Sequence, residues 1–542
     1  MFSEFANRIR IKKYAHKIPG AGLESWEQTA HRVATHVFRA VRPPEIYPET
    51  IQGMIARREF MPGGRYLAST GREFHQTQNC LLLKAQDSRE GWADLSKKCF
   101  MALMTGAGIG VVYSPVRPKG KLIRRTGGVA TGPIALMQMI NDGGRQIRQG
   151  GERRSAIWAG LHWWHEDIFE FIHIKNWSED VKRLKAKDYN FPAPLDGTNI
   201  SVILDREFFN AFDDEAHPKH SWARNVYWQA VKQMCSTAEP GFSIDYEDSA
   251  ECLRNACTEV TSADTDDICN LGSINMARVQ SLDHMRDLVH FGCAFLLAGT
   301  VYSHYPYPEV DMVRSKNRRL GLGLMGLHEW LIQRGKKYGP DAELEEYLKI
   351  YAQATGVAAD LAQMMELSAP VKTRAIAPTG TIGIVAETTT GIEPIFCVAY
   401  KRRYIKTNEV HAFEYVVDPT AKRLIDSGVD PDTIEDAYSI EPEWRIAFQA
   451  WVQQYVDHGI SSTINTPPWG SPQINEGNYR DFGEMLYPYL PKLRGLTCYP
   501  DGARSGQPLT PVRYDRIKNL IGKVYEEYGD ACEVRGGGTC GS

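Results

Sequence analysis

Apolar runs of strand length and amphipathic stretches of helix length alternate along almost the whole chain, without a long linker. The helix predicted at 25–41 begins with a capping-box pattern, Ser25 and Gln28, and ends before Pro43. Further helices are predicted at 91–104, 131–148, 284–303, 320–335 and 343–367, and strands at 79–83, 106–113, 199–205 and 461–465. This alternation favours one α/β domain with helices on both faces of its sheet.

Composition narrows the class of protein. The 542 residues are 43% hydrophobic and 24% charged, with a net charge of −3 that gives no basic field for nucleic acid. No apolar run approaches the ~20 residues that span a bilayer, and the first residues lack the apolar segment of a secretory signal. The 11 cysteines are too sparse for a secreted disulfide scaffold. We therefore expect a cytoplasmic protein that binds neither nucleic acid nor membrane.

One segment gathers groups that could do chemistry. Asn255, Cys257 and Glu259 are spaced by two residues, so in an extended segment their side chains face the same way. Cys269 follows beyond a polar run of turn-forming residues, which could return it near Cys257. An alternating strand with a buried cysteine fits the same spacing. A zinc site that includes Cys252 fits poorly, because no histidines follow at ligand spacing.

These segments resemble the catalytic chains of ribonucleotide reductases. The motif from Asn255 to Glu259, followed by the run 269–275 (CNLGSIN), is similar to the active-site loop of that family. The short interval between the two motifs is most like the adenosylcobalamin-dependent class, class II. Other segments match the family in order: 79–80, 87–88, 117, 149–156, 318–327 (a family helix), 377–383, 391–394 and 496–504.

The resemblance implies a fold and a division of the chain. We expect a ten-stranded α/β barrel of the ribonucleotide reductase and glycyl-radical type, at 76–527, preceded by a small helical region at 1–75. A flexible, redox-active tail would follow at 528–542. Inside the barrel, the family places specificity-site elements, here 84–157, and a central finger loop, here 252–272.

The family chemistry replaces the ribose 2′-hydroxyl of a ribonucleotide by hydrogen, for DNA synthesis. The resemblance makes Cys257 the carrier of a transient thiyl radical that takes the 3′-hydrogen. Glu259 would be the general base for the 3′-hydroxyl, and Asn255 would hold the substrate hydroxyls. Cys80 and Cys269 would supply two electrons and end as a disulfide.

Two further sets of residues follow from the resemblance. Cys532 and Cys540 on the tail would reopen the disulfide by exchange and be reduced by thioredoxin or glutaredoxin. Binding roles fall to a substrate-phosphate loop (Thr379, Gly380, Thr381, Ile382, Gly383), a substrate and specificity loop (Asn79, Gly151, Arg153, Arg154) and a site for dNTP or ATP effectors (Asp87, Ser88, Arg117). Effector motifs of this kind imply a homodimer.

The source of the radical has two candidates. Adenosylcobalamin is favoured, because the last strand carries Cys498-Tyr499 and not the adjacent tyrosines of class I chains. The alternative is a compact class I alpha subunit that takes its radical from a separate, small metal-containing subunit. The matched segments begin near residue 25, which leaves no room for an ATP cone, so we expect no overall inhibition by dATP.

A dehydrogenase is the remote alternative. The run from Gly321 to Gly326 satisfies the G-x-G-x-x-G pattern of NAD-binding Rossmann folds, and Asp341 follows at about the right ~20 residues. That fingerprint requires a buried strand just before it, and the basic run 314–319 cannot form one.

Overall fold

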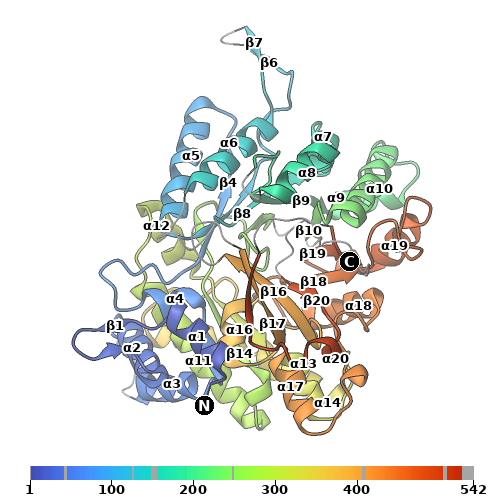
Figure 1. Ribbon diagram of the computed structural model, residues 1–542. Coiled ribbons are helices and arrows are strands. Elements are labelled where there is room, and N and C mark those ends of the chain that lie inside the picture. The colour runs from blue at the N-terminus through green and yellow to red at the C-terminus, as the bar shows by residue number, and fades with distance from the viewer. Residues whose placement is uncertain are drawn as a thin grey trace.

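The computed structural model describes residues 2–41, 46–124, 127–147, 155–188, 191–246, 250–405, 411–503 and 509–527. In these ranges helices surround two groups of strands at the centre of the molecule (Figure 1). Of the sequence predictions, the strand–helix alternation is confirmed, and the capping box of Ser25 is present with both of its hydrogen bonds, at 2.8 and 3.2 Å. No helix in the described part of the chain is long and apolar enough to cross a membrane.

The larger sheet has eight strands, in the order β13 (Asp267–Ile268), β4 (Cys80–Lys84), β5 (Gly108–Val112), β8 (Ile157–His162), β9 (Thr198–Asp205), β10 (Gly241–Asp245), β19 (Gly495–Pro500) and β18 (Thr463–Thr466). From β4 to β10 all neighbours are parallel. The pairs β13 with β4 and β10 with β19 are antiparallel, and the last strand, β18, is parallel to β19. The connecting helices are α5 (Arg89–Met104), α6 (Pro133–Gln146), α7 (Ile168–His173), α8 (Glu179–Lys187), α9 (Arg206–Asp213) and α10 (His220–Thr237), which cover the outer face of this sheet (Figure 1).

The smaller sheet has the order β15 (Gly321–Met325), β14 (Leu271–Asn275) and β3 (Phe60–Pro62). Only residues 269–270 separate β13 from β14, so the segment 267–275 passes from the larger sheet into the smaller one. Isolated bridges, Leu322 with Arg374 and Ile376 with Ile460, continue from β15 towards β18. The described strands thus form two linked sheets and not one closed, ten-stranded sheet, so the expected barrel is found only in this coarser form.

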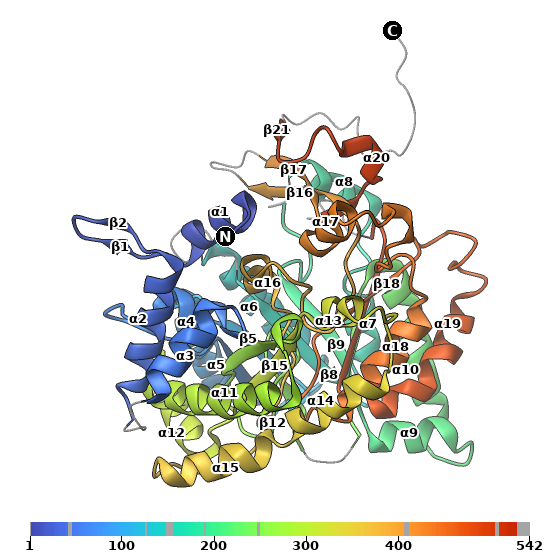
Figure 2. The ribbon, with the colours of Figure 1, turned by 90° about the horizontal axis from the view of Figure 1, so that it is seen from below.

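Helices of the two ends of the chain complete the core. The N-terminal region holds α1 (Glu4–Lys13), α2 (Trp26–Phe38), α3 (Ile46–Ala56), α4 (Gly64–Ser69) and the short strands β1 (Lys17–Ile18) and β2 (Gly22–Leu23). The second half holds α11 (Leu282–Tyr302), α12 (Pro308–Asn317), α13 (Leu327–Gln333), α14 (Ala342–Ala352), α15 (Ala354–Met364), α16 (Gly380–Ala386), α18 (Pro442–Gln453) and α19 (Tyr479–Leu486). The helix α11 packs against α2, α14 and α15 and is buried along most of its length (Figure 2).

Two small additions lie outside this core. The sheet β20 (Leu509–Pro511), β16 (Ala399–Ile405), β17 (His411–Val417) and β21 (Val524–Glu527) lies at one end of the molecule with α17 (Pro419–Asp426) and α20 (Tyr514–Ile517) (Figure 2). The hairpin β6 (Leu122–Ile123) and β7 (Gly128–Val129) projects away from the body, next to α5 and α6 (Figure 1).

Two helix predictions are wrong. The stretch predicted as one helix at 320–335 is the strand β15 followed by α13. The alternation of glycine and leucine explains the strand: a Cβ on Gly323 would lie 2.6 Å from the carbonyl oxygen of Ala375, so only glycine lets the next segment approach. The stretch 343–367 is two helices, α14 and α15, which meet at Gln353.

Candidate active site in the finger loop

The tip of the finger loop rests on strand β5. Its two arms, β11 (Leu253–Arg254) and β12 (Thr261–Ser262), pair antiparallel, so residues 255–260 form the tip of a hairpin. Glycines on β5 make room for it. A Cβ on Gly110 would lie 1.9 Å from the carbonyl oxygen of Arg254, and one on Gly108 would lie 2.9 Å from the Cβ of Ala256. The backbone of the loop can reach this position only because β5 has no side chains there.

The tip is a turn and not an extended segment. The backbone N–H of Thr258 donates to the carbonyl oxygen of Asn255 at 3.0 Å, and Thr258 has a φ of +69°. The expectation that an extended backbone aligns the three side chains is therefore wrong in its geometry. The turn nevertheless brings two of them together, since Nδ2 of Asn255 donates to Oε1 of Glu259 at 2.9 Å. Oδ1 of Asn255 accepts from the N–H of Val260 at 3.0 Å, which fixes the orientation of the amide.

Glu259 is a buried carboxyl with one free oxygen. The residue is 1% exposed, and its Oε2 has no hydrogen-bond partner among the described residues. Burial raises the pKa of Glu259 to about 7, although the hydrogen bond from Asn255 opposes the rise. A carboxyl of this kind can exchange a proton near neutral pH with a group placed at Oε2.

Cys80 and Cys269 face each other where β4 meets β13. The N–H of Cys269 donates to the carbonyl oxygen of Cys80 at 2.8 Å, and the N–H of Cys80 donates to the sulfur of Cys269 at 3.0 Å. Both residues are buried. Burial, the neighbouring Cys80 and Glu259 all raise the pKa of Cys269. The structure thus brings together two cysteines that lie far apart in the sequence.

Cys257 lies next to the same groups. Burial of its thiol raises the pKa of Cys257, and Glu259 and Cys80 raise it further. The thiol therefore stays protonated at neutral pH, which suits hydrogen-atom transfer better than nucleophilic attack. The residue as a whole is partly exposed, whereas Asn255, Cys80 and Cys269 are buried. The five residues predicted to be catalytic thus form one cluster.

The predicted phosphate loop lies at the start of α16. Thr379 precedes the helix with a φ of +45°, and its Oγ1 accepts from the N–H of Gly391 at 2.9 Å. A Cβ on Gly383 would lie 2.8 Å from a methyl group of Thr390. The two motifs 377–383 and 391–394 are therefore packed together. Their binding role stays a prediction, and so does that of Asn79, whose N–H donates to the carbonyl oxygen of Cys269 at 3.1 Å.

The predicted effector residues also lie together. Asp87 follows β4 and Arg117 follows the neighbouring β5, and their side chains form an ion pair at 2.7 Å. Ser88 caps α5 by accepting from the N–H of Gly91 at 2.9 Å, so its hydroxyl serves the helix. The remaining predicted residues, Gly151, Arg153, Arg154, Cys532 and Cys540, lie outside the described residues.

Buried ion pairs around the site were not predicted from the sequence. Arg445 pairs with Glu393 of the motif 391–394 at 2.6 Å, and Glu393 also accepts from the N–H of Thr463 on β18 at 2.6 Å. Arg319 pairs with Glu251, just before the finger loop, and with Asp267 within it. Charged residues beside apolar strands did indicate that some charges are buried. Their partners could not be predicted, because they lie more than 50 residues away in the sequence. In the described part of the chain, no three His, Cys, Asp or Glu side chains form a group that could hold a metal ion.

The chain is similar in sequence to known ribonucleotide reductases over most of its length. A vitamin B12-dependent ribonucleoside-diphosphate reductase of Thermoplasma acidophilum is 25% identical, over 86% of this chain and 66% of the relative. The enzyme of the same name in Mycobacterium tuberculosis is 26% identical, over 97% of this chain and 81% of the relative. A Mycobacterium phage D29 protein, named for adenosylcobalamin-dependent ribonucleoside-triphosphate reduction, is 26% identical, over 83% of this chain and 75% of the relative.

The family model described as "Ribonucleotide reductase, barrel domain" matches residues 78–248, 252–365 and 371–498, which include the finger loop and every cysteine of the cluster. This match covers well over half of the chain. The chain therefore belongs to the ribonucleotide reductase family of enzymes, through the barrel domain of their large subunit.

Proposed function

We propose that the chain reduces ribonucleotides to 2′-deoxyribonucleotides with a thiyl radical on Cys257. The observation that carries this proposal is the cluster itself: one partly exposed cysteine, one buried carboxyl with a free oxygen, and two buried cysteines that lie opposite each other and share a hydrogen bond. We also propose that the two linked sheets act as a ten-stranded barrel around the finger loop. The bridges that lead from β15 towards β18 support this closure.

The first half of the reaction uses Cys257, Glu259 and Asn255. The sulfur radical takes the 3′-hydrogen atom of the ribose and becomes a thiol again. Glu259, with a pKa of about 7, accepts the 3′-hydroxyl proton on its free Oε2. Asn255 holds the other oxygen of Glu259 and keeps the carboxylate pointed at the substrate. Burial of the loop keeps water from the radical.

The second half uses the buried pair. The 2′-hydroxyl leaves as water, and the substrate gains two electrons and two protons in exchange. Cys80 and Cys269 supply them and are oxidised to a disulfide. Their placement opposite each other supports this role, because opposite residues of an antiparallel pair have Cβ atoms ~4.5–5.5 Å apart, near the ~4 Å of a disulfide. The 3′-hydrogen returns from Cys257, which restores its radical.

For the radical source we propose class II chemistry. Adenosylcobalamin, when bound, supplies the one-electron oxidation that turns a thiol into a thiyl radical. The names of the relatives from Thermoplasma acidophilum and Mycobacterium tuberculosis support this source. Cys257 is the residue that would meet it, since it is partly exposed as a residue whereas Cys80 and Cys269 are buried. The second candidate is a radical from a separate metal-containing subunit.

Electron supply, regulation and assembly complete the proposal. Cys532 and Cys540 carry electrons from thioredoxin or glutaredoxin to the buried pair. The sparse cysteines, 11 in number, fit a reducing cytoplasm, in which thiols stay reduced. The ion pair of Asp87 and Arg117 lies within the site for dNTP or ATP effectors. We further propose a homodimer, because the resemblance of 87–88 and 117 to effector-contacting positions implies one.

The test is an assay of the purified chain with adenosylcobalamin, a dithiol and either CDP or CTP, with no other protein present. Formation of the deoxynucleotide, and its loss in Cys257→Ser, is the expected result. No product with either substrate, together with product after a metal-containing small subunit is added, would replace class II by the second candidate. Full activity of Cys257→Ser would contradict the radical mechanism itself.

A further inference from the structure

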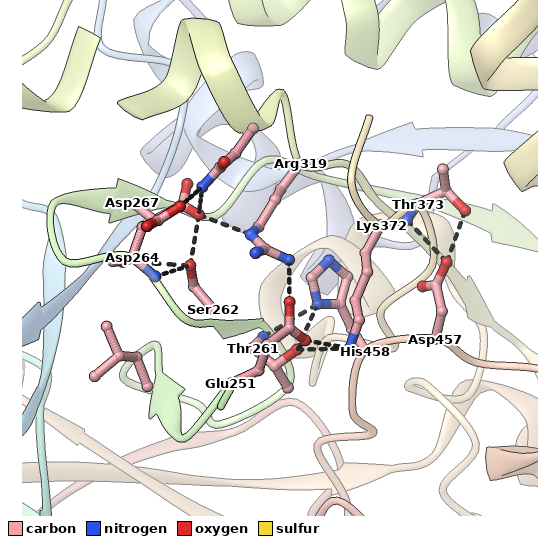
Figure 3. Close-up of polar contacts among 12 residues, drawn as sticks. Glu251, Thr261, Ser262, Asp264, Asp267, Arg319, Lys372, Thr373, Asp457 and His458 are labelled. Atoms are coloured by element: carbon pink, nitrogen blue, oxygen red, sulfur yellow. Dashed lines mark hydrogen bonds and ion pairs between the residues drawn. The ribbon is translucent and has the colours of Figure 1, made fainter. Parts of the chain in front are cut away.

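A buried group of charged and polar side chains lies at the base of the finger loop (Figure 3). We call it the clamp, and it consists of Glu251, Thr261, Asp267, Arg319, Lys372 and His458. Glu251 lies just before the loop enters its first arm, and Thr261 and Asp267 lie on the way out. The other three members come from the segments before β15, before the bridge at Arg374 and before the bridge at Ile460.

Arg319 holds both sides of the loop at once. Its Nη1 lies 2.9 Å from Oε1 of Glu251, and its Nε lies 2.7 Å from Oδ2 of Asp267. The three side chains are 3%, 8% and 1% exposed, so water cannot replace either partner. The contact with Glu251 is an ion pair, while Nε donates a hydrogen bond to Asp267, and the planar guanidinium spaces these two carboxylates in a way that the compact ammonium of lysine cannot reproduce.

The Glu251 side of the clamp reaches towards Glu259. Oε2 of Glu251 accepts from the hydroxyl of Thr261 at 2.8 Å and pairs with Lys372. Although burial opposes it, Arg319 and Lys372 hold the pKa of Glu251 below its usual range. Thr261 follows Glu259 by two residues, so the position of Glu251 sets the arm that carries the catalytic carboxyl.

His458 adds a second hold on the same arm. Its Nδ1 accepts from the N–H of Thr261 at 3.1 Å, which requires an unprotonated Nδ1. Burial, followed by Arg319 and Lys372, lowers the pKa of His458, so the ring stays neutral. The next residue, Gly459, donates its N–H to the carbonyl oxygen of Glu259 at 2.7 Å.

The Asp267 side of the clamp reaches towards Cys269. Oδ2 of Asp267 accepts from the hydroxyl of Ser262 at 2.7 Å and from Nδ2 of Asn317 at 2.9 Å, besides its pair with Arg319. Asp267 lies on β13, and Cys269 follows it by two residues, just after the strand ends. Arg319 therefore links Glu251, which bonds the arm next to Glu259, to the strand that directly precedes Cys269.

We propose that Arg319 is a positioning residue of the reaction: by bonding Glu251 and Asp267 together, it sets where Cys257 and Glu259 lie relative to Cys269. The inference rests on the proposed function for its effect on turnover. Its effect on the cysteine pair does not, because that can be measured without substrate or cofactor.

The experiment compares Arg319→Gln and Arg319→Lys with the native chain. The matched control is Lys316→Gln, three residues before Arg319, which removes an exposed ion pair with Asp264. Reduced protein is treated with diamide, and the disulfide between Cys80 and Cys269 is followed by mass spectrometry of peptides. The two thiols give two electrons and two protons to diamide, which becomes a hydrazine. Turnover is then measured with the radical source that supports activity in the native chain.

Misplacement of reacting groups by about 1 Å can slow a reaction by two orders of magnitude, so Arg319→Gln is expected to lower both the disulfide rate and kcat at least about tenfold. KM for the ribonucleotide should change less than about threefold, because the phosphate loop lies on α16, outside the clamp. Arg319→Lys keeps one pair and should fall in between. Lys316→Gln should match the native chain.

Native rates in both Arg319 variants would overturn the inference. If Arg319→Gln fails to fold, Glu251→Gln replaces it, since this change removes one arm of the clamp and leaves Asp267 paired. A loss of kcat and of disulfide rate no larger than the loss of folded fraction, measured by circular dichroism, would also contradict a positioning role, because unfolded protein lowers the apparent kcat and leaves KM unchanged. If the native chain makes no deoxynucleotide and the disulfide rates still differ, the proposed function fails while the positioning of Cys269 stands.

Discussion

The side-chain amide of Asn255 donates to Oε1 of Glu259 at 2.9 Å, while Oε2 of the same carboxyl has no partner among the described residues. One oxygen is thus fixed by the protein and the other is left for a substrate. This asymmetry is what a general base needs, because the fixed oxygen orients the carboxylate and the free oxygen takes the proton. It also makes the pH dependence of the enzyme predictable.

Turnover should rise with pH through about 7. Burial raises the pKa of Glu259 from 4.5 to about 7, so the carboxylate that acts as base is present only above that pH. We expect kcat at saturating ribonucleotide to increase between pH 6 and 8 as one ionisation and then to level off. A profile that is flat across this range would show that Glu259 does not ionise in the rate-determining step.

Replacing Asn255 should shift that profile to higher pH. Its hydrogen bond lowers the pKa of Glu259 against the effect of burial, so Asn255→Ala removes a stabiliser of the carboxylate. The expected result is a lower kcat and an apparent pKa above that of the native chain, measured from the same pH series. An unchanged apparent pKa in Asn255→Ala would contradict the assignment of the titration to Glu259.

The raised pKa also affects stability. An acid whose pKa is higher in the folded than in the unfolded state loses stability as pH rises from the unfolded value, 4.5, to the folded value, about 7. Glu259→Gln removes this loss, so the variant should be inactive yet more stable than the native chain at pH 8, by up to about 3 kcal/mol. Urea denaturation at pH 5 and pH 8 measures the difference, which should be small at pH 5.

The sequence allowed us to name the residues of the candidate cluster but not the way the chain brings them together. Motif order placed Cys257, Glu259 and Cys269 in one loop, and Cys80 on a facing strand. The backbone of the tip could not be predicted, because spacing alone does not distinguish an extended segment from the turn that closes at Thr258. Both arrangements place residues two or four apart on the same side, but only the turn brings Asn255 and Glu259 into contact.

Buried charges were the harder part. Arg319 lies 52 residues after Asp267, and each alone looks like an ordinary surface residue in the sequence. Their pairing follows only from the placement of β13 beside β4 and of β15 beside β14. The mistaken helix at 320–335 has a local cause. The run that begins at Gly321 alternates like a strand, but it leads directly into the helix α13, so the two elements look like one in the sequence.

Substituting Gly110 should displace the finger loop. Its Cβ would lie 1.9 Å from the carbonyl oxygen of Arg254, and the backbone of the loop must move to avoid it. We expect Gly110→Ala to lose about 1–3 kcal/mol of stability by overpacking and to lose most turnover. Gly356→Ala on α15 is the control, because no atom lies within 4 Å of the new Cβ. Normal turnover in Gly110→Ala would mean that the loop tolerates another position.

Removing either buried thiol should stop reduction and leave substrate binding intact. Cys269→Ser cannot form the disulfide with Cys80, so a reduced chain without added dithiol should make no deoxynucleotide, whereas the native chain should make at least one per active site. Rapid quench of a single turnover measures this, and binding of the ribonucleotide is measured by equilibrium dialysis. Cys99→Ala, at a buried thiol on α5, is the control. A full burst in Cys269→Ser would assign the electrons to another pair.

The N-terminal segment should affect the affinity for substrate through Glu387. This residue follows α16, and its carboxylate accepts from the N–H of Ser3 at 2.9 Å and pairs with Arg58 at 2.7 Å. The guanidinium of Arg58 lies 4.7 Å from the ring of Phe2. The start of the chain and Arg58 thus together hold the C-terminal end of α16, whose N-terminal end carries the predicted phosphate loop. α1 lies beside α16 in Figure 2.

Glu387→Gln should therefore raise KM for the ribonucleotide roughly three- to tenfold, which corresponds to about 0.7–1.4 kcal/mol of binding energy. kcat at saturation should stay within about twofold, because the cysteine cluster lies on other elements. Arg58→Ala should reproduce the effect, whereas Lys422→Ala, which removes an exposed pair with Asp426 on α17, should not. A fall in kcat with an unchanged KM would mean that the contacts of Glu387 act on the finger loop and not on α16.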